Sequence, residues 1–205
     1  MLPEGWRMAT VAELLERDSR PVRVESEAIY TEIGIRSHGR GVFHKEPVSG
    51  AQIGDKRVFQ VVENALVLNI VFAWEQAIAL TSRRDAGLIA SHRFPMYRPK
   101  AGTCDLRFVY HYFMCPRGKE LLDLASPGGA GRNRTLGQQA FESIPLPCPP
   151  LEEQLRISDA LHAWDDAISV ARRLSEARRD AADLIRERLV RSAMQFKAVP
   201  LFELA

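Results

Sequence analysis

Basic side chains interspersed with glycines form several segments in the middle of the chain, and such a pattern suits contact with a polyanion. Residues 34–45 contain three Arg or Lys, two His and three Gly, with no acidic residue before Glu46. Guanidinium and ammonium groups bind phosphates and guanine edges, and glycines allow close approach of the backbone. We therefore expect a DNA-contacting loop here. The alternative is a flexible basic hairpin without a ligand.

Two further segments have the same character. Residues 81–99 carry five basic or histidine side chains against one Asp, with aromatic residues between them, a pattern typical of nucleic-acid surfaces. Residues 126–136 end in Arg-Asn-Arg, where Asn can pair with adenine and Arg with guanine or phosphate. The predicted DNA-binding residues are Arg36, His38, Arg40, Lys45, Arg83, Arg84, Arg93, Arg132, Asn133 and Arg134.

The net charge of the chain is only +2, but its distribution is uneven. Residues 36–134 carry 15 basic and 8 acidic side chains, whereas residues 1–35 carry 4 and 7, and the remainder carries 9 and 11. The positive excess therefore lies wholly in the middle block, which indicates a polyanionic partner there. A solvated surface that happens to be basic is the alternative.

The sequence offers little support for catalysis, a metal or a cofactor. No Asp or Glu stands two residues before any Lys, and there is no Asn/Asp-Pro-Pro-Tyr/Phe motif or glycine-rich methyl-donor loop. The glycines of residues 34–41 match neither a dinucleotide fingerprint nor a P-loop. Cys104, Cys115 and Cys148 form no zinc-binding pattern. We expect no enzyme activity, although a catalytic pair assembled from distant residues stays open as an alternative.

The cysteines and the hydropathy indicate a cellular location. Isolated cysteines are typical of buried thiols in a reducing compartment. No secretory or transit segment opens the chain, and the longest apolar run, residues 70–74, is far too short for a bilayer. We expect a cytoplasmic protein without a membrane partner.

Short apolar, β-branched runs between residues 19 and 99 predict a compact, mainly β domain. Residues 94–99 are expected as an edge strand, because prolines disfavour a central position. Trp74 and Glu75 are expected at a turn between two strands, where a lone Glu is expected to be structural. Two short helices divided by Pro116 are predicted over residues 106–124, and a strand over residues 141–146.

Residues 149–197 predict one long helix. Two prolines and two glutamates open it, and neither Gly nor Pro follows between Leu151 and Val199. A helix of about 45 residues is roughly 65–70 Å long, so we expect it to pack against another helix. Apolar residues recur at steps of three and four through Ile157, Leu161, Trp164, Ile168, Ala171 and Leu174. The seam is assigned to the larger of these side chains: Ile157, Leu161, Trp164, Ile168 and Leu174. A coiled-coil arm of no particular family is the alternative.

The junction before this helix carries a family resemblance. It matches the pattern I-P-L-P-x-P-P-L-x-E-Q-x-x-I of the DNA-specificity subunits of type I restriction–modification enzymes. Leu2–Trp6, Phe72–Glu75 and the glycine-rich stretch before Leu136 are also similar to that family. The matching residues are Ile144-Pro145-Leu146-Pro147-Cys148-Pro149-Pro150-Leu151-Glu152-Glu153-Gln154-Leu155-Arg156-Ile157.

The resemblance implies one half of such a subunit, with an α+β fold. Residues 1–148 would form a mainly β target-recognition domain, and residues 149–197 a conserved helix that packs as an antiparallel coiled coil. Residues 196–205 match residues 6–15 in pattern. The tail, residues 198–205, would then begin a second repeat. The resemblance also implies a protein without catalytic activity that reads half of a bipartite target in double-stranded DNA. Its helix would dock methyltransferase subunits and, through them, a restriction subunit.

Family members usually carry two such halves, and this chain carries one. Either it dimerises through the helix, or it is a piece of a longer protein. A coiled-coil adaptor that does not read DNA, and a stand-alone DNA-modifying enzyme, remain the alternatives.

Overall fold

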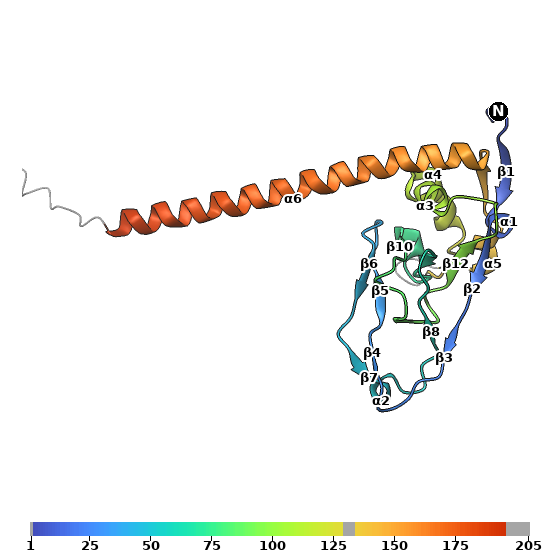
Figure 1. The fold of residues 1–205 in the computed structure, drawn as a ribbon, viewed down its shortest axis with the longest axis horizontal. Helices are drawn as coiled ribbons and strands as arrows, with labels where there is room; N and C mark the ends of the chain where they lie inside the picture. The colour runs from blue at the N-terminus through green and yellow to red at the C-terminus, as the bar shows by residue number, and fades with distance from the viewer. Residues whose placement is uncertain (1, 129–133, 196–205) are drawn as a thin grey trace, which may run out of the picture. The chain divides into compact units, whose positions relative to one another are not determined.

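The computed structural model describes residues 2–128 and 134–195, with side chains described as far as Ser192. The chain forms two compact units, residues 1–159 and residues 160–205. The long helix α6, drawn in orange to red in Figure 1, begins in the first unit and forms the described part of the second. The predicted boundary at residue 148 stays a prediction, since the first unit also includes the first turns of α6.

The first unit is built mainly from short strands joined by tight turns. Its elements are, in order, β1 (Arg7–Thr10), α1 (Val11–Leu14), β2 (Leu15–Asp18), β3 (Pro21–Val22), β4 (Ile29–Tyr30), β5 (Ile33–Ile35), β6 (Val42–His44), β7 (Val48–Ser49), α2 (Gly50–Ile53), β8 (Val58–Gln60), β9 (Leu66–Leu68), η1 (Ala73–Glu75), β10 (Ile78–Leu80), β11 (Ile89–Ser91), β12 (Met96–Pro99), α3 (Leu106–Met114), α4 (Pro116–Leu124), α5 (Gln138–Glu142), β13 (Pro145–Cys148) and the start of α6 (Leu151–Gln195).

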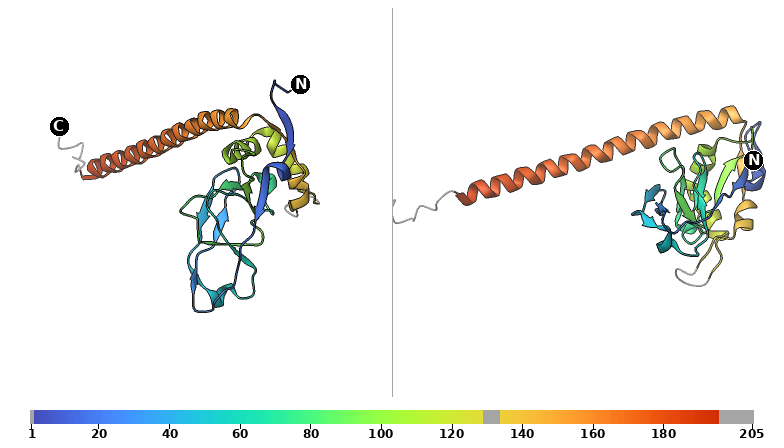
Figure 2. Two further views of the ribbon diagram at one scale, coloured as in Figure 1. Left: turned by 45° about the vertical axis from the view of Figure 1, so that its right-hand side comes forward. Right: turned by 60° about the horizontal axis from the view of Figure 1, so that its bottom comes forward.

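The strands pair antiparallel in five small sheets. The largest has the order β10-β9-β12-β2, and the next has the order β11-β8-β3. The pairs β4–β7, β5–β6 and β1–β13 complete the set among the described residues. Figure 2 shows the strands gathered in one body, with the helices α3 and α4 beside them. The predicted mainly β domain followed by one long helix is confirmed, whereas coiled-coil packing of that helix stays a prediction.

The edge-strand assignment of residues 94–99 is wrong, because β12 lies between β9 and β2. The register explains how prolines fit there. Only Met96 and Tyr97 pair with β9, whereas all four residues of β12 pair with β2. Pro99, at the end of the strand, therefore lies beyond the reach of β9 and need not donate on that side.

The strand predicted over residues 141–146 is also misplaced. Residues 138–142 form the short helix α5, and the strand β13 begins only at Pro145. Phe141 and Ile144 are both buried, and their spacing of three residues is helical rather than extended. The Phe141 ring lies 5.2 Å from Tyr97 and 5.3 Å from Phe113, measured between centroids, which places it at the centre of the main core.

The two helices predicted on either side of Pro116 are confirmed, and their caps explain their boundaries. Asp105 caps α3 by accepting a hydrogen bond from the Phe108 amide at 3.0 Å. Pro116 takes the first position of α4, where its missing N–H costs nothing. The turn predicted around Glu75 is confirmed as η1, between β9 and β10.

The start of α6 is fixed to the first unit by buried polar contacts. The Gln154 side chain accepts from the Asp105 amide at 3.0 Å and donates to the Pro149 carbonyl at 2.8 Å. Ser158 donates to the Asp105 carboxylate at 2.9 Å. Gln154 and Ser158 are both buried, so the junction motif supplies the hydrogen bonds that lock the helix entry.

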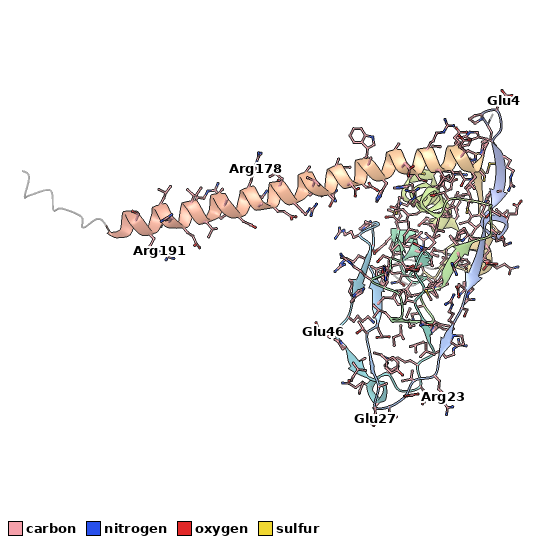
Figure 3. All side chains as sticks on the ribbon, viewed as in Figure 1. Glu4, Arg23, Glu27, Glu46, Arg178 and Arg191 are labelled. Carbon is pink, nitrogen blue, oxygen red and sulfur yellow. The ribbon has the colours of Figure 1, made fainter. Side chains whose placement is uncertain are left out.

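The second unit, the helix from Ala160 onward, exposes the predicted seam. Trp164 is 69% exposed, Ile168 45% and Leu174 53%. Side chains project along the whole described helix, Arg178 and Arg191 among them (Figure 3). Among the described residues, no helix is both long and apolar enough to span a membrane.

Candidate nucleic-acid interface

The first basic segment forms an ordered β-hairpin. Strands β5 and β6 pair from Ile33–His44 to Ile35–Val42, and residues 36–41 form the tip between them. The tip is bound to the turn that contains η1. The His38 amide donates to the Glu75 carbonyl at 2.8 Å, and the Ser37 hydroxyl donates to the Glu75 carboxylate at 2.8 Å. The expected structural role of Glu75 thus has a concrete form: it holds the hairpin tip.

Aromatic packing fixes the base of the same hairpin. The Phe43 ring lies against Gly34, where any side chain would collide with the ring. The Arg36 guanidinium stacks on the same Phe43 ring, 4.6 Å from the ring centroid. Arg36 is therefore partly committed to holding the hairpin.

The second basic segment is tied to the hairpin by a buried carboxylate. Asp85 is bonded to His44 on β6 at 2.8 Å and accepts from the Ser82 amide at 2.7 Å and the Ser82 hydroxyl at 2.8 Å. Burial alone would raise the pKa of Asp85, but these hydrogen bonds outweigh it and hold the pKa below its ordinary value. Arg83 and Arg84, both exposed, are thereby placed beside β6.

A basic groove lies at the junction of the hairpin and the sheet of β8 and β11. Its volume is about 520 Å³. The residues lining it are Glu32, Lys45, Asp55, Lys56, Arg57, Ser91, His92 and Arg93, and we call this set the basic groove. Four Lys or Arg thus face two acids, and one of these acids, Glu32, already pairs with Lys45 at 3.2 Å. The groove is suited to hold an anionic group.

The groove brings together two predicted residues, Lys45 and Arg93, and adds Lys56, Arg57 and His92, which were not predicted. The signal in the sequence is the adjacent pair Lys56-Arg57, which follows the single acid Asp55. Its link to Arg93 depends on strand pairing, since the His92 amide donates to the Arg57 carbonyl at 3.2 Å.

A second concave surface, of about 530 Å³, carries Arg83 together with Arg20 and Arg98. Arg20 binds Asp18 through two hydrogen bonds of 3.0 Å, and Arg98 lies 3.8 Å from the same carboxylate. Two of its three cations are therefore partly neutralised, which makes this surface a weaker anion site than the basic groove.

The third basic segment lies only partly within the described residues. Arg132 and Asn133 fall outside them. Arg134 is described, and its guanidinium donates to the carbonyls of Ser126 at 3.0 Å and Asp123 at 2.7 Å. It also pairs with the Asp123 carboxylate at 2.8 Å and lies over Trp74 at 5.4 Å. These contacts give Arg134 a role in holding the chain between α4 and α5.

The remaining predicted residues are exposed on the globular unit: Arg36, His38, Arg40, Lys45, Arg83, Arg84 and Arg93. Within the part of the chain that the structure describes, no three His, Cys, Asp or Glu side chains are grouped to hold a metal ion. The geometry thus offers a basic surface that includes the turn of the β5–β6 hairpin, and such a surface suits binding of a polyanion.

Comparison with known protein families shows which family this basic domain belongs to. Residues 45–177 match the family model for the type I restriction modification DNA specificity domain, so more than half of the chain is matched. The chain belongs to this family. Among curated protein sequences, no match was found.

Solved structures share the fold. The HsdS subunit from Thermoanaerobacter tengcongensis aligns with a TM-score of 0.69 at 22% identity, over 91% of this chain and 49% of that one. A structure described under complex assembly and conformational transition of the type I R-M system aligns with a TM-score of 0.71 at 20% identity, over 98% and 52%. The S subunit from M. genitalium aligns with a TM-score of 0.51 at 15% identity, over 81% and 41%. The chain spans about half the length of these proteins.

Proposed function

We propose that this chain is the DNA-recognition subunit of a type I restriction–modification complex and has no catalytic activity of its own. The observation that carries the proposal is the basic groove on a domain of this family, where four Lys or Arg outnumber two acids. The globular unit reads one half of a bipartite target in double-stranded DNA.

Binding rests mainly on charge in this mechanism. Each Lys or Arg that meets a phosphate releases condensed counterions, so affinity falls steeply with salt. Phosphate contacts set the position of the protein on the duplex, and a smaller number of base contacts select the sequence. The groove is concave and basic, which suits the convex phosphate backbone.

The helix α6 supplies the contacts with other proteins in this proposal. It docks methyltransferase subunits and, through them, a restriction subunit. Its exposed apolar face pairs with a second copy of the chain in an antiparallel coiled coil, which brings two recognition domains to one target. A symmetric pair implies a target made of two related half-sites. We place the complex in the cytoplasm.

The test is DNA binding by the chain assembled with its methyltransferase subunits, measured over a range of salt concentrations. We expect Lys56→Ala, Arg57→Ala and Arg93→Ala each to weaken binding to every sequence and to reduce the slope of log affinity against log salt by about 1. Arg117→Ala is the matched control, because Arg117 is an exposed cation on α4 outside the groove and should leave the slope unchanged.

Two results would overturn the proposal. If the assembled complex shows no salt-dependent binding, the chain is an adaptor that does not touch DNA. If the purified chain methylates or cleaves DNA without other subunits, it is an enzyme. Slopes unchanged in all three groove variants would instead remove the groove from the binding surface.

A further inference from the structure

The tip of the β5–β6 hairpin is held at several points, which is unusual for an exposed turn. Besides the contacts of His38 and Ser37 with Glu75, the Gly39 amide donates to the Gln76 carbonyl at 3.0 Å, and the Tyr110 hydroxyl reaches the Gly39 carbonyl at 3.4 Å. The Met114 side chain packs where a Cβ of Gly39 would stand. The turn after η1 and the helix α3 thus fix the backbone of the tip.

His38 adopts a conformation that the surrounding contacts must maintain. Its φ is +60°, in the left-handed region, which a residue with a side chain rarely occupies. Such conformations persist where neighbouring contacts determine them, and they cluster at functional sites. The result is that the imidazole and the Arg40 guanidinium project from a backbone that is already ordered before any ligand binds.

The cations of the interface differ in whether their side chains already contact other residues of the domain. Arg36 stacks on Phe43, Lys45 pairs with Glu32, and Arg134 is held by Asp123. The side chains of His38 and Arg40 are exposed and form no hydrogen bond or ion pair with any residue that the structure describes. Their full hydrogen-bonding capacity remains for a ligand.

Shape separates these two residues from Lys56, Arg57 and Arg93 of the basic groove. Base edges lie at the floor of the major groove, roughly 8.5 Å deep, which admits a two-stranded β-ribbon. A concave surface meets the outer phosphates. Strands β5 and β6 form a two-stranded ribbon (Figure 1), and the exposed side chains of His38 and Arg40 lie in the turn at its end.

We propose, on the basis of the proposed function, that Arg40 and His38 are the residues of this domain that read bases, whereas the basic groove holds phosphates. Arg40 binds the O6 and N7 acceptors of a guanine in the major groove through two parallel hydrogen bonds, the commonest specific Arg contact. His38 makes one hydrogen bond to an adjacent base pair. Glu75 is a positioning residue, since it holds the tip without facing the bases.

The experiment is selection from a library of randomised duplexes by the chain assembled with its methyltransferase subunits. Arg40→Ala and Arg40→Lys should each lose preference for guanine at one position by about 10- to 100-fold, because Lys cannot make the paired contact. His38→Gly should relax an adjacent position while keeping the left-handed backbone, which glycine adopts freely. Arg93→Ala, in the groove, should weaken all sequences equally.

The outcomes keep the two proposals apart. Unchanged base preference in Arg40→Ala and His38→Gly, or an equal loss on all sequences, overturns the base-reading assignment and leaves DNA binding intact. Loss of base preference confined to the two tip variants supports it. Failure of the wild-type complex to show any salt-dependent binding would instead defeat the proposed function. Circular dichroism spectra and melting temperatures like those of the wild type exclude misfolding, and His38→Asn, which tolerates the left-handed backbone, provides a second variant if His38→Gly is unstable.

Discussion

The buried thiols of Cys104 and Cys148 show how burial sets the chemistry of a side chain. Cys104 and Cys148 are both buried, and burial is the largest cause that raises the pKa of each, to about 11 for Cys104. The Thr103 hydroxyl lowers the pKa of Cys104, but by less. Both cysteines therefore stay protonated in the folded protein at neutral pH. A protonated thiol is a poor nucleophile and a poor metal ligand.

This raised pKa makes stability depend on pH. In the folded protein Cys104 holds its proton up to about pH 11, whereas the unfolded thiol releases it near its ordinary value of 9.0. The contribution of Cys104 is therefore fully present below pH 9 and is lost as the pH rises toward 11. We expect the free energy of unfolding of the wild type to fall by roughly 1 kcal/mol more than that of Cys104→Ala between pH 8 and pH 10.

Urea denaturation of both proteins at these two pH values measures the difference. Because both proteins share every other titrating group, comparing their pH dependence removes the general alkaline loss of stability. Curves that run parallel from pH 8 to pH 10 would show that the Cys104 thiol is not protected from ionisation by the fold.

At the scale of elements, the entry of α6 depends on one buried amide. Gln154→Leu keeps a similar volume but leaves the Asp105 amide and the Pro149 carbonyl without their partners. Unsatisfied buried polar groups cost roughly 1–3 kcal/mol each, so the loss of both partners should lower the free energy of unfolding of the globular unit by roughly 2–6 kcal/mol. Thermal or urea denaturation followed by circular dichroism measures it.

Glu152→Gln is the matched control for this change, since Glu152 is an exposed residue in the same helical turn. A Gln154→Leu protein as stable as Glu152→Gln would mean that the junction motif is maintained for a reason other than the helix entry.

Elements with a local signal could be predicted from the sequence, and elements set by pairing could not. The helices around Pro116 have their own caps and periodicity. Residues 34–45, expected as a loop, form the β5–β6 hairpin, because the pairing of the two strands is not visible in the local pattern. The central place of β12 depends on how far β9 overlaps it, which no local pattern shows. The basic groove arises because pairing of β8 with β11 sets Ser91 opposite Val58 and thus His92 beside Arg57. Charge alone could not show that Arg134 is bound to Ser126 and Asp123 whereas Arg40 is exposed.

At the scale of the whole molecule, the described helix from Ala160 onward carries an exposed apolar stripe. Leu161, Trp164, Ile168, Ala171 and Leu174 lie at steps of three and four residues, and the four large side chains among them are at least 39% exposed. A contiguous exposed apolar face of this kind marks a protein–protein contact. Its spacing suits a second helix, and the simplest partner is a second copy of the same helix.

We expect the isolated chain to have twice its single-chain mass of 23.1 kDa when measured by light scattering. Trp164→Glu and Leu161→Glu should each convert the dimer to a monomer, because a charge placed in an apolar helix contact is costly to bury. Arg178→Gln, an exposed change on the same helix, should leave the mass at the dimer value.

Either result of the mass measurement is informative about assembly. A dimer that the seam variants disrupt means that two recognition domains are joined through α6 and that the target consists of two related half-sites. A monomeric wild type would contradict self-pairing and leave the apolar face for another chain. Co-purification with methyltransferase subunits, lost in Trp164→Glu but kept in Arg178→Gln, would then identify that chain as the occupant of the stripe.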